Sequence, residues 1–252
     1  MGSTEAPQLK IVGVVASREV TAVLDRVEAA VDGKKVNVLQ VDARVDMTQR
    51  AERNWRHLVD GKFGARARFV GLDIEAGANV DVVGDICAPA KALRTSLGRS
   101  PFDLVVCDRV LEHVKAPWLA AATVTDLLGP GGHLVVTVPW VQAHHAYPDD
   151  YWRMSFAAVM LLFESLEPVS LFYTGGAAGL DVAYRVSRGD RVEVSPAIGA
   201  VEQGLFQMVL DHDENRRLLE AQPGQRHPLS RAWLPTMFVN VVARKPAKVA
   251  KS

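Results

Sequence analysis

The chain has 252 residues, of which 48% are hydrophobic and 23% are charged, a composition typical of a folded domain with a sizeable core. Its 29 basic and 29 acidic residues give a formal net charge of zero, which argues against a nucleic-acid or anionic-membrane binder that relies on excess positive charge. No apolar run approaches 18 residues and no signal-peptide pattern opens the chain, so we expect no membrane span and a cytoplasmic location. Cys87 and Cys107 are too few for a disulfide framework or a cysteine metal cluster, so we expect buried free thiols.

The first 35 residues are predicted to form an N-terminal helical segment. Apolar side chains recur at helical spacing from Glu19 to Val31, and Asp32-Gly33 follows as a stop signal. From residue 36 onward, short apolar runs alternate with helical patterns. The predicted strands cover residues 36–41, 69–74, 80–83, 102–107, 133–138, 168–173 and 236–243. The predicted helices cover residues 47–59, 89–97, 110–127 and 155–163, and further helical runs fall within 196–222.

This alternation predicts an α/β fold, a parallel sheet with helices on both faces. Polar groups that follow the carboxyl ends of such strands are where open α/β sheets bind ligands. We therefore expect function at residues 108–113 and 144–153. Gly175, Gly176 and Gly179 indicate a flexible turn, and residues 247–252 a disordered tail.

Six segments stand in one order along residues 36–246. They are VGLDI (70–74), VDVVGDI (80–86), FDLVVCDRVLEHV (102–114), LLGPGGHLVVTVP (127–139), YPDDYWRMS (147–155) and VARKP (242–246). Together they resemble the class I S-adenosylmethionine-dependent methyltransferases, specifically the type 11 group. The resemblance implies a Rossmann-like seven-stranded sheet whose last strand is antiparallel, in a domain spanning 36–246 with acceptor-side loops and helices at 140–155 and 175–235.

The resemblance also implies cofactor contacts at the ends of the first four strands. Asp73 ends a strand where a carboxylate can accept hydrogen bonds from ribose hydroxyls. Asp85 would accept from the adenine amine while apolar side chains cover the ring. The remaining implied contacts are Ile74, Ile86, Cys107 and Asp108. The alternative for Asp73 and Asp85 is ordinary turn chemistry at a strand end.

One loop departs from the family pattern. The family's first strand leads through an acidic residue into a glycine-rich loop, whereas here Gln40 replaces the acid and Asp42 and Arg44 stand where glycines are expected. Three interpretations stay open. Asp42 holds the cofactor's ammonium and Arg44 its carboxylate; or the loop is disordered until ligands arrive; or the cofactor site has decayed in a silent homologue.

The loop after the 133–138 strand is rich in groups suited to an acceptor. A hydroxyl acceptor needs a base, and histidine titrates near neutral pH. The candidate catalytic residues are His145, His144, Asp108 and His113. The candidate substrate contacts are Glu112, Tyr147, Asp149, Asp150 and Tyr151; for Glu112 the alternative is capping and core support. Asp108, Asp149 and Asp150 are candidate ligands for Mg²⁺, although no spacing demands a metal.

These features predict transfer of a methyl group to a hydroxyl of a small polar acceptor. Aromatic side chains stack on sugar faces and carboxylates accept from hydroxyls, so a sugar or oligosaccharide precursor is favoured, as in O-methyltransferases of bacterial polysaccharide biosynthesis, including methylmannose polysaccharides. The alternatives are small-molecule natural-product methylation and a catalytically silent scaffold. The helical runs at 196–222 would suit a homodimer contact.

Overall fold

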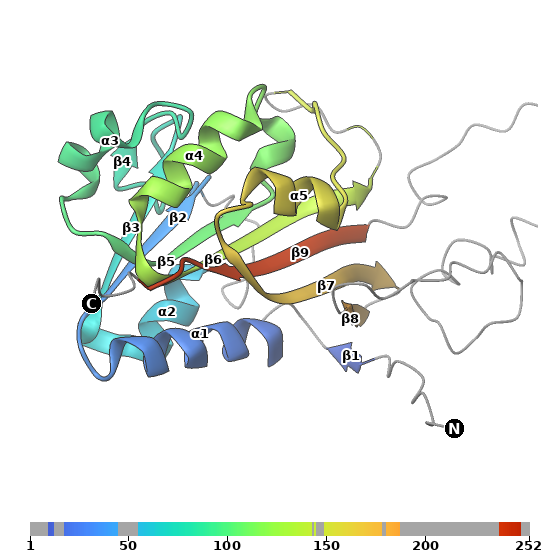
Figure 1. Ribbon diagram of the computed structural model, residues 1–252, viewed down its shortest axis with the longest axis horizontal. Helices are drawn as coiled ribbons and strands as arrows, with labels where there is room; N and C mark the ends of the chain where they lie inside the picture. Colours follow the sequence, from blue (N-terminus) through green and yellow to red (C-terminus); the bar gives the residue numbers. More distant parts are fainter. Residues whose placement is uncertain are drawn as a thin grey trace, which may run out of the picture.

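The computed structural model describes residues 10–12, 18–44, 55–142, 144, 149–177, 180–186 and 237–247. Within them, strands gather into one mixed sheet with helices on both faces (Figure 1). The strands are β1 (Lys10–Val12), β2 (Val36–Val41), β3 (Ala67–Asp73), β4 (Val82–Val83), β5 (Phe102–Asp108), β6 (Leu128–Val141), β7 (Glu167–Ala177), β8 (Leu180–Val186) and β9 (Met237–Arg244). The helices are α1 (Arg18–Val31), α2 (Trp55–Phe63), α3 (Ala90–Leu97), α4 (Pro117–Leu127) and α5 (Phe156–Leu162), with 3₁₀ turns η2 (Gly64–Arg66) and η3 (Leu111–His113).

The strand order confirms the predicted seven-stranded sheet. Strands β4, β3, β2, β5 and β6 pair in parallel, and β9 inserts antiparallel between β6 and β7. The last strand in the chain is thus antiparallel, as expected. Two further strands, β8 and β1, extend the sheet beyond β7 and were not predicted.

Two expectations at this edge are wrong. Lys10–Val12 is a strand rather than part of a helical segment, because it pairs with β8. Gly175 and Gly176 lie within β7 rather than in a turn, because the backbone of β8 pairs with them. The predicted helical runs at 196–222 lie outside the described residues, as do residues 248–252.

Each face of the sheet buries its own apolar cluster. Helices α1 and α2 cover one face, and α3, α4 and α5 cover the other (Figure 1). Along α1, the fully or nearly buried side chains are Val20, Val23, Leu24, Val27 and Val31. They share a cluster with Val36 and Val38 of β2, so α1 packs directly on the sheet. The predicted boundary at residue 35 would have placed α1 outside the domain that contains this sheet.

The predicted helix 110–127 is divided. Pro117 occupies the first turn of α4, where its missing N–H costs nothing, and the preceding residues form only the short turn η3. The break leaves a segment between β5 and α4 that is available to a ligand site. β6 is longer than the predicted strand 133–138, because the segment Gly129–Gly132 before it also belongs to the strand.

The connection between β3 and β4 also differs from the usual pattern. Parallel strands are commonly joined through a helix, but residues 74–81 contain none. The loop instead folds back on β3, where Asp81 Oδ2 accepts from the Gly71 amide at 2.8 Å. A Cβ on Gly71 would lie 2.0 Å from the Asn79 carbonyl oxygen, so this close approach requires glycine.

Candidate functional site

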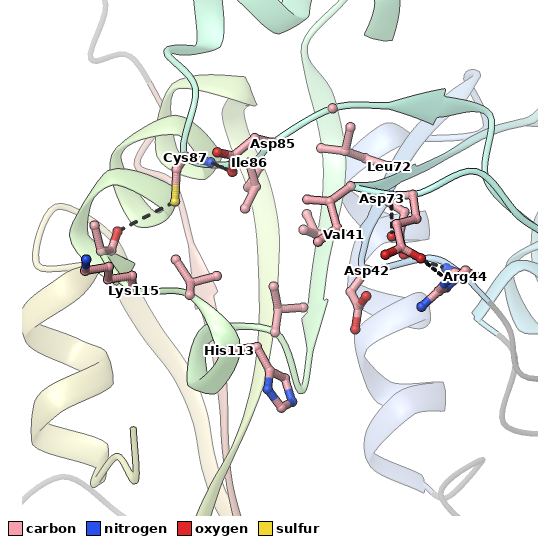
Figure 2. A pocket seen from close by; sticks show the side chains of 16 residues that line it. Val41, Asp42, Arg44, Leu72, Asp73, Asp85, Ile86, Cys87, His113 and Lys115 are labelled. Carbon is pink, nitrogen blue, oxygen red and sulfur yellow. Dashed lines mark hydrogen bonds and ion pairs between the residues drawn. The ribbon is translucent and has the colours of Figure 1, made fainter. Parts of the chain in front are cut away.

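A cavity of about 770 Å³ opens at the carboxyl ends of the parallel strands. Its walls come from the ends of β2 and β3, the segment after β4, and the turn between β5 and α4. Figure 2 shows its lining residues: Val41, Asp42, Arg44, Leu72, Asp73, Ile74, Glu75, Gly84, Asp85, Ile86, Cys87, Val110, His113, Val114, Lys115 and Ala116. This is the edge at which α/β sheets of this kind bind ligands.

Asp73 anchors one wall of the cavity. It is only 4% exposed, and its two oxygens accept from the backbone amides of Arg44 and Glu75, each at 3.0 Å. The Arg44 guanidinium forms an ion pair with Glu75. Each carboxylate oxygen has a second lone pair, so Asp73 can still accept hydrogen bonds from a ligand.

The loop after β2 keeps a turn that glycine usually supplies. Asp42 has φ 57°, in the left-handed region that Asp tolerates better than most residues. The loop is fastened on both sides, since Ala43 N donates to the Leu72 carbonyl at 3.2 Å and Asn79 Nδ2 donates to the Ala43 carbonyl at 2.9 Å. The altered sequence therefore preserves a defined backbone path.

The carboxyl of Asp42 is electrostatically unusual. The residue is exposed towards the cavity, yet protein atoms surround its carboxyl, and this desolvation is the largest cause that raises its pKa to about 7. The charge of Asp73 and a hydrogen bond between the two carboxyls raise it further, while Arg44 and Arg109 lower it. The Asp42 carboxyl is therefore partly protonated near neutral pH, and a cation arriving beside it would favour its ionised form.

Apolar side chains also contribute to the lining of the cavity. Ile86 is buried and Ile74 is 56% exposed, although both line the cavity. Asp85 Oδ1 accepts from the Cys87 amide at 2.8 Å, which fixes the turn after β4. Burial, followed by the nearby Asp85 charge, raises the pKa of the Cys87 thiol. The apolar side chains of Ile74 and Ile86, together with the Asp85 carboxylate, suit a flat ring with an amine at its edge.

The loop after β6 clamps onto η3. The Glu112 carbonyl accepts from the amides of Tyr151 at 2.8 Å and Trp152 at 3.3 Å. His113 Nδ1 contacts the Asp149 carbonyl, which can only accept, so Nδ1 carries the proton in neutral imidazole and Nε2 carries the lone pair. The segment 149–153 is thereby brought against the turn that lines the cavity.

Side chains stiffen this clamp. The Arg153 guanidinium donates to both oxygens of Asp150, and the Tyr151 hydroxyl donates to Asp149 Oδ2 at 2.7 Å. Trp152 Nε1 donates to the Val114 carbonyl at 2.9 Å. Two loops far apart in sequence therefore act as one unit.

The structure gathers part of the predicted site. The predicted residues that line the cavity are Asp42, Arg44, Asp73, Ile74, Asp85, Ile86 and His113. Gln40, Cys107 and Asp108 do not line it, and the Gln40 side-chain oxygen is buried with no hydrogen-bond partner among the described residues. Cys107 belongs to the core, and burial raises the pKa of its thiol to about 12. His144 is exposed, whereas His145 and Tyr147 lie outside the described residues.

The hypothesis of a magnesium site gains no support. Within the described ranges, no group of three or more His, Cys, Asp or Glu residues could hold a metal ion. The three candidate carboxylates have other partners: Asp108 accepts from Trp55 Nε1 at 3.4 Å, while Asp149 and Asp150 hold the clamp.

Several lining residues were not predicted. Glu75 and Cys87 line the cavity from segments that the sequence analysis treated as connections, and Lys115 lines it from within the predicted helix 110–127. The signal that could have located Glu75 and Cys87 is their position two residues after a strand-end aspartate, whose carboxylate often accepts from that amide. No comparable signal marks Lys115.

The fold and the position of the cavity together define a class I methyltransferase architecture. A family model described as a methyltransferase domain matches residues 12–172, well over half of the chain. The chain belongs to this family and is an S-adenosylmethionine-dependent methyltransferase. No helix in the described part is long and apolar enough to cross a membrane.

The chain is also similar to solved structures at low sequence identity. The N-methyltransferase NodS from Bradyrhizobium japonicum, in complex with S-adenosyl-L-homocysteine, is 18% identical with a TM-score of 0.42, covering 68% of this chain and 87% of its own. A SAM-dependent methyltransferase from Archaeoglobus fulgidus is 15% identical with a TM-score of 0.45, covering 91% and 95%. The YcgJ protein from Bacillus subtilis is 12% identical with a TM-score of 0.47, covering 90% and 99%. No curated protein matches the sequence.

Proposed function

We propose that this protein transfers a methyl group to a hydroxyl of a small polar acceptor, with a sugar or oligosaccharide precursor as the favoured class. The observation that carries the proposal is the cavity itself, whose lining includes Asp73, Asp85 and His113 from three separate segments (Figure 2). S-Adenosylmethionine would supply the methyl group on a positively charged sulfur.

The cofactor's parts match the chemistry of the walls. Asp73 would accept from the ribose hydroxyls through the lone pairs that the Arg44 and Glu75 amides leave available. Ile74 and Ile86 would cover the adenine faces, and Asp85 would accept from its amine.

The altered loop can hold the amino-acid end of the cofactor. Asp42 would pair with the ammonium after giving up its proton, and Arg44 would bind the carboxylate while still contacting Glu75. These roles explain how the loop can serve the cofactor without the family's glycines, and they disfavour the silent scaffold.

On the acceptor side, a histidine is proposed as the general base. His113 lines the cavity, and the contact of its Nδ1 with Asp149 directs the lone pair of neutral imidazole to Nε2. The base would take the hydroxyl proton, and the oxygen would accept the methyl group from S-adenosylmethionine, which would leave as neutral S-adenosylhomocysteine. His144 and His145 remain alternative bases. Tyr151, which is 46% exposed, and Asp149 would contact a hydroxylated ring.

The test is methyl transfer from labelled S-adenosylmethionine to a panel of monosaccharides, short mannose oligosaccharides and hydroxylated aromatic compounds. The proposal expects labelled methyl ether on a sugar, and loss of the acidic limb of the pH–rate profile when the true base among the three histidines is replaced by Gln. Labelling only of aromatic compounds would replace the sugar acceptor with a natural-product substrate.

A further inference from the structure

Glu112 is a buried acid that the proposed mechanism does not use. Its side chain is 0% exposed, and neither carboxylate oxygen has a hydrogen-bond partner in the part of the chain that the structure describes. Buried polar groups are nearly always hydrogen-bonded, because leaving one unsatisfied costs free energy. Such a group at the edge of a ligand cavity requires an explanation.

Charged groups face Glu112 from four elements. Asp108 and Arg109 approach from the end of β5, Asp42 from the end of β2, and Arg153 from the loop after β6. On its own turn, His113 Nε2 lies 4.0 Å from Glu112 Oε1. The Arg153 guanidinium donates two hydrogen bonds to Asp150.

This environment disfavours the carboxylate form. Burial is the main cause that raises the pKa of Glu112 to about 8, and the charges of Asp108 and Asp42 add to the rise. The backbone amide of Glu112 and the charge of Arg109 act in the opposite direction. The carboxyl is therefore largely protonated near neutral pH and poised to lose its proton.

Glu112 is also close enough to the cavity to respond to its charge. Val110 and His113 flank it in sequence and both line the cavity, as does Asp42, whose charge reaches Glu112. At an effective dielectric constant of about 20, a unit charge about 10 Å away changes a protonation constant by roughly tenfold. A cation bound in the cavity would therefore favour the ionised form of Glu112.

We infer that Glu112 is a specificity-determining residue that lets the site distinguish the positively charged S-adenosylmethionine from its neutral product, S-adenosylhomocysteine. The inference rests on the proposed cofactor cavity. When the cation binds, Glu112 releases its proton to solvent, and the carboxylate then stabilises the bound sulfonium through space. When methyl transfer leaves a neutral sulfur, Glu112 takes a proton back from solvent, and the site holds the product less tightly.

Calorimetric titration in two buffers of different ionisation enthalpy, such as phosphate and Tris at pH 7.5, measures protons released on binding. Both ligands carry the same ammonium and carboxylate, so any proton from Asp42 that the ammonium displaces is released with both. The wild-type protein should release several tenths of a proton more with S-adenosylmethionine than with S-adenosylhomocysteine. Glu112→Gln should abolish that difference, whereas Asp42→Asn, which removes one of the charges that raise the pKa of Glu112, should lower the release common to both ligands and leave a smaller difference.

Equal proton release with both ligands in the wild-type protein would overturn the inference, and so would a difference that persists in Glu112→Gln. If neither ligand binds, the cofactor cavity itself is refuted, which is a separate failure. If Glu112→Gln does not fold, the wild-type protein decides alone. The ratio of S-adenosylmethionine to S-adenosylhomocysteine affinity should rise roughly three- to tenfold between pH 6.5 and 8.5, and a flat ratio would contradict the inference.

Discussion

The two sides of the cavity are built in different ways. The side proposed to hold adenosine (the adenosine side), residues 42–44 and 71–86, is fixed by backbone groups, and both oxygens of its central Asp73 accept backbone amides. The side proposed to face the acceptor (the acceptor side), residues 108–114 and 149–153, is fixed by contacts between two loops. It includes Glu112, whose carboxylate oxygens have no hydrogen-bond partner among the described residues. The first side is suited to hold one ligand in one geometry, whereas the second contains a carboxyl whose charge we propose to change during the reaction.

The largest expected effect comes from the closest packing on the adenosine side. Gly71→Ala would place a Cβ 2.0 Å from the backbone oxygen of Asn79, which cannot move without displacing the 74–81 loop. We expect a loss of about 3 kcal/mol or more in the free energy of unfolding, measured by urea denaturation.

The matched control is Gly61→Ala in α2, where nothing lies within 4 Å of the added Cβ. It should stabilise the protein by about 0.5–1 kcal/mol, because alanine favours a helix more than glycine does. A similar change in the free energy of unfolding in both variants would mean that the 74–81 loop does not approach Gly71 as closely as described.

The next effect concerns the acceptor side and depends on pH. The pKa of Glu112 is about 8 in the folded protein, against the ordinary value of 4.5 for the unfolded chain. Between these values the folded state holds a proton that the unfolded state releases, so this group's contribution to stability is lost as pH rises from about 4.5 to 8. The Glu112→Gln variant has no carboxyl at this position, so it does not lose stability in this way as pH rises.

The stability of Glu112→Gln relative to wild type should therefore increase across that window, by roughly 3–5 kcal/mol in total, and level off above pH 8. Urea denaturation at several pH values measures it. A difference that stays constant with pH would show that the carboxyl is not held protonated.

A smaller effect should separate the two sides. Arg153→Lys loses the paired hydrogen bonds to Asp150 and loosens the 149–153 clamp. Hydrogen exchange of the Tyr151 and Trp152 amides, which donate to the backbone carbonyl of Glu112, should become about tenfold faster. The Glu75 amide on the adenosine side should be unaffected, and equal acceleration at both sites would contradict the independence of the two sides.

The smallest effect tests the backbone of the altered loop. Because Asp42 has φ 57°, Asp42→Ala should be less stable than Asp42→Asn by about 1 kcal/mol, since both variants remove the charge and asparagine tolerates this conformation better than alanine. Thermal unfolding of the three proteins makes the comparison. Equal stability of the two variants would argue against the left-handed turn.

The sequence predicted the parts of the fold that depend on local patterns. The Val- and Leu-rich runs of β5 and the helical spacing of α1 identify buried elements, and a strand-end acid such as Asp73 identifies the ligand edge. Strands β1 and β8 were missed because their place depends on pairing with distant segments.

The electrostatic features were also beyond local patterns. The raised pKa of Glu112 depends on acids contributed by two other strand ends and on burial by a loop nearly 40 positions later. The left-handed turn at Asp42 could be suspected only from its place in the family motif.

The most direct test of the account compares S-adenosylhomocysteine affinity in the wild-type protein, Asp73→Asn and Asp103→Asn, by calorimetric titration. Asp103 is the matched control, because its carboxylate also accepts a backbone amide, from Asn37 at 2.8 Å, but lies near the amino end of β5, away from the cavity. The account predicts binding by the wild-type protein, an affinity about 10- to 100-fold lower in Asp73→Asn, and no change in Asp103→Asn. Equal affinity in all three proteins would contradict the claim that this cavity, with Asp73 at its wall, holds the cofactor.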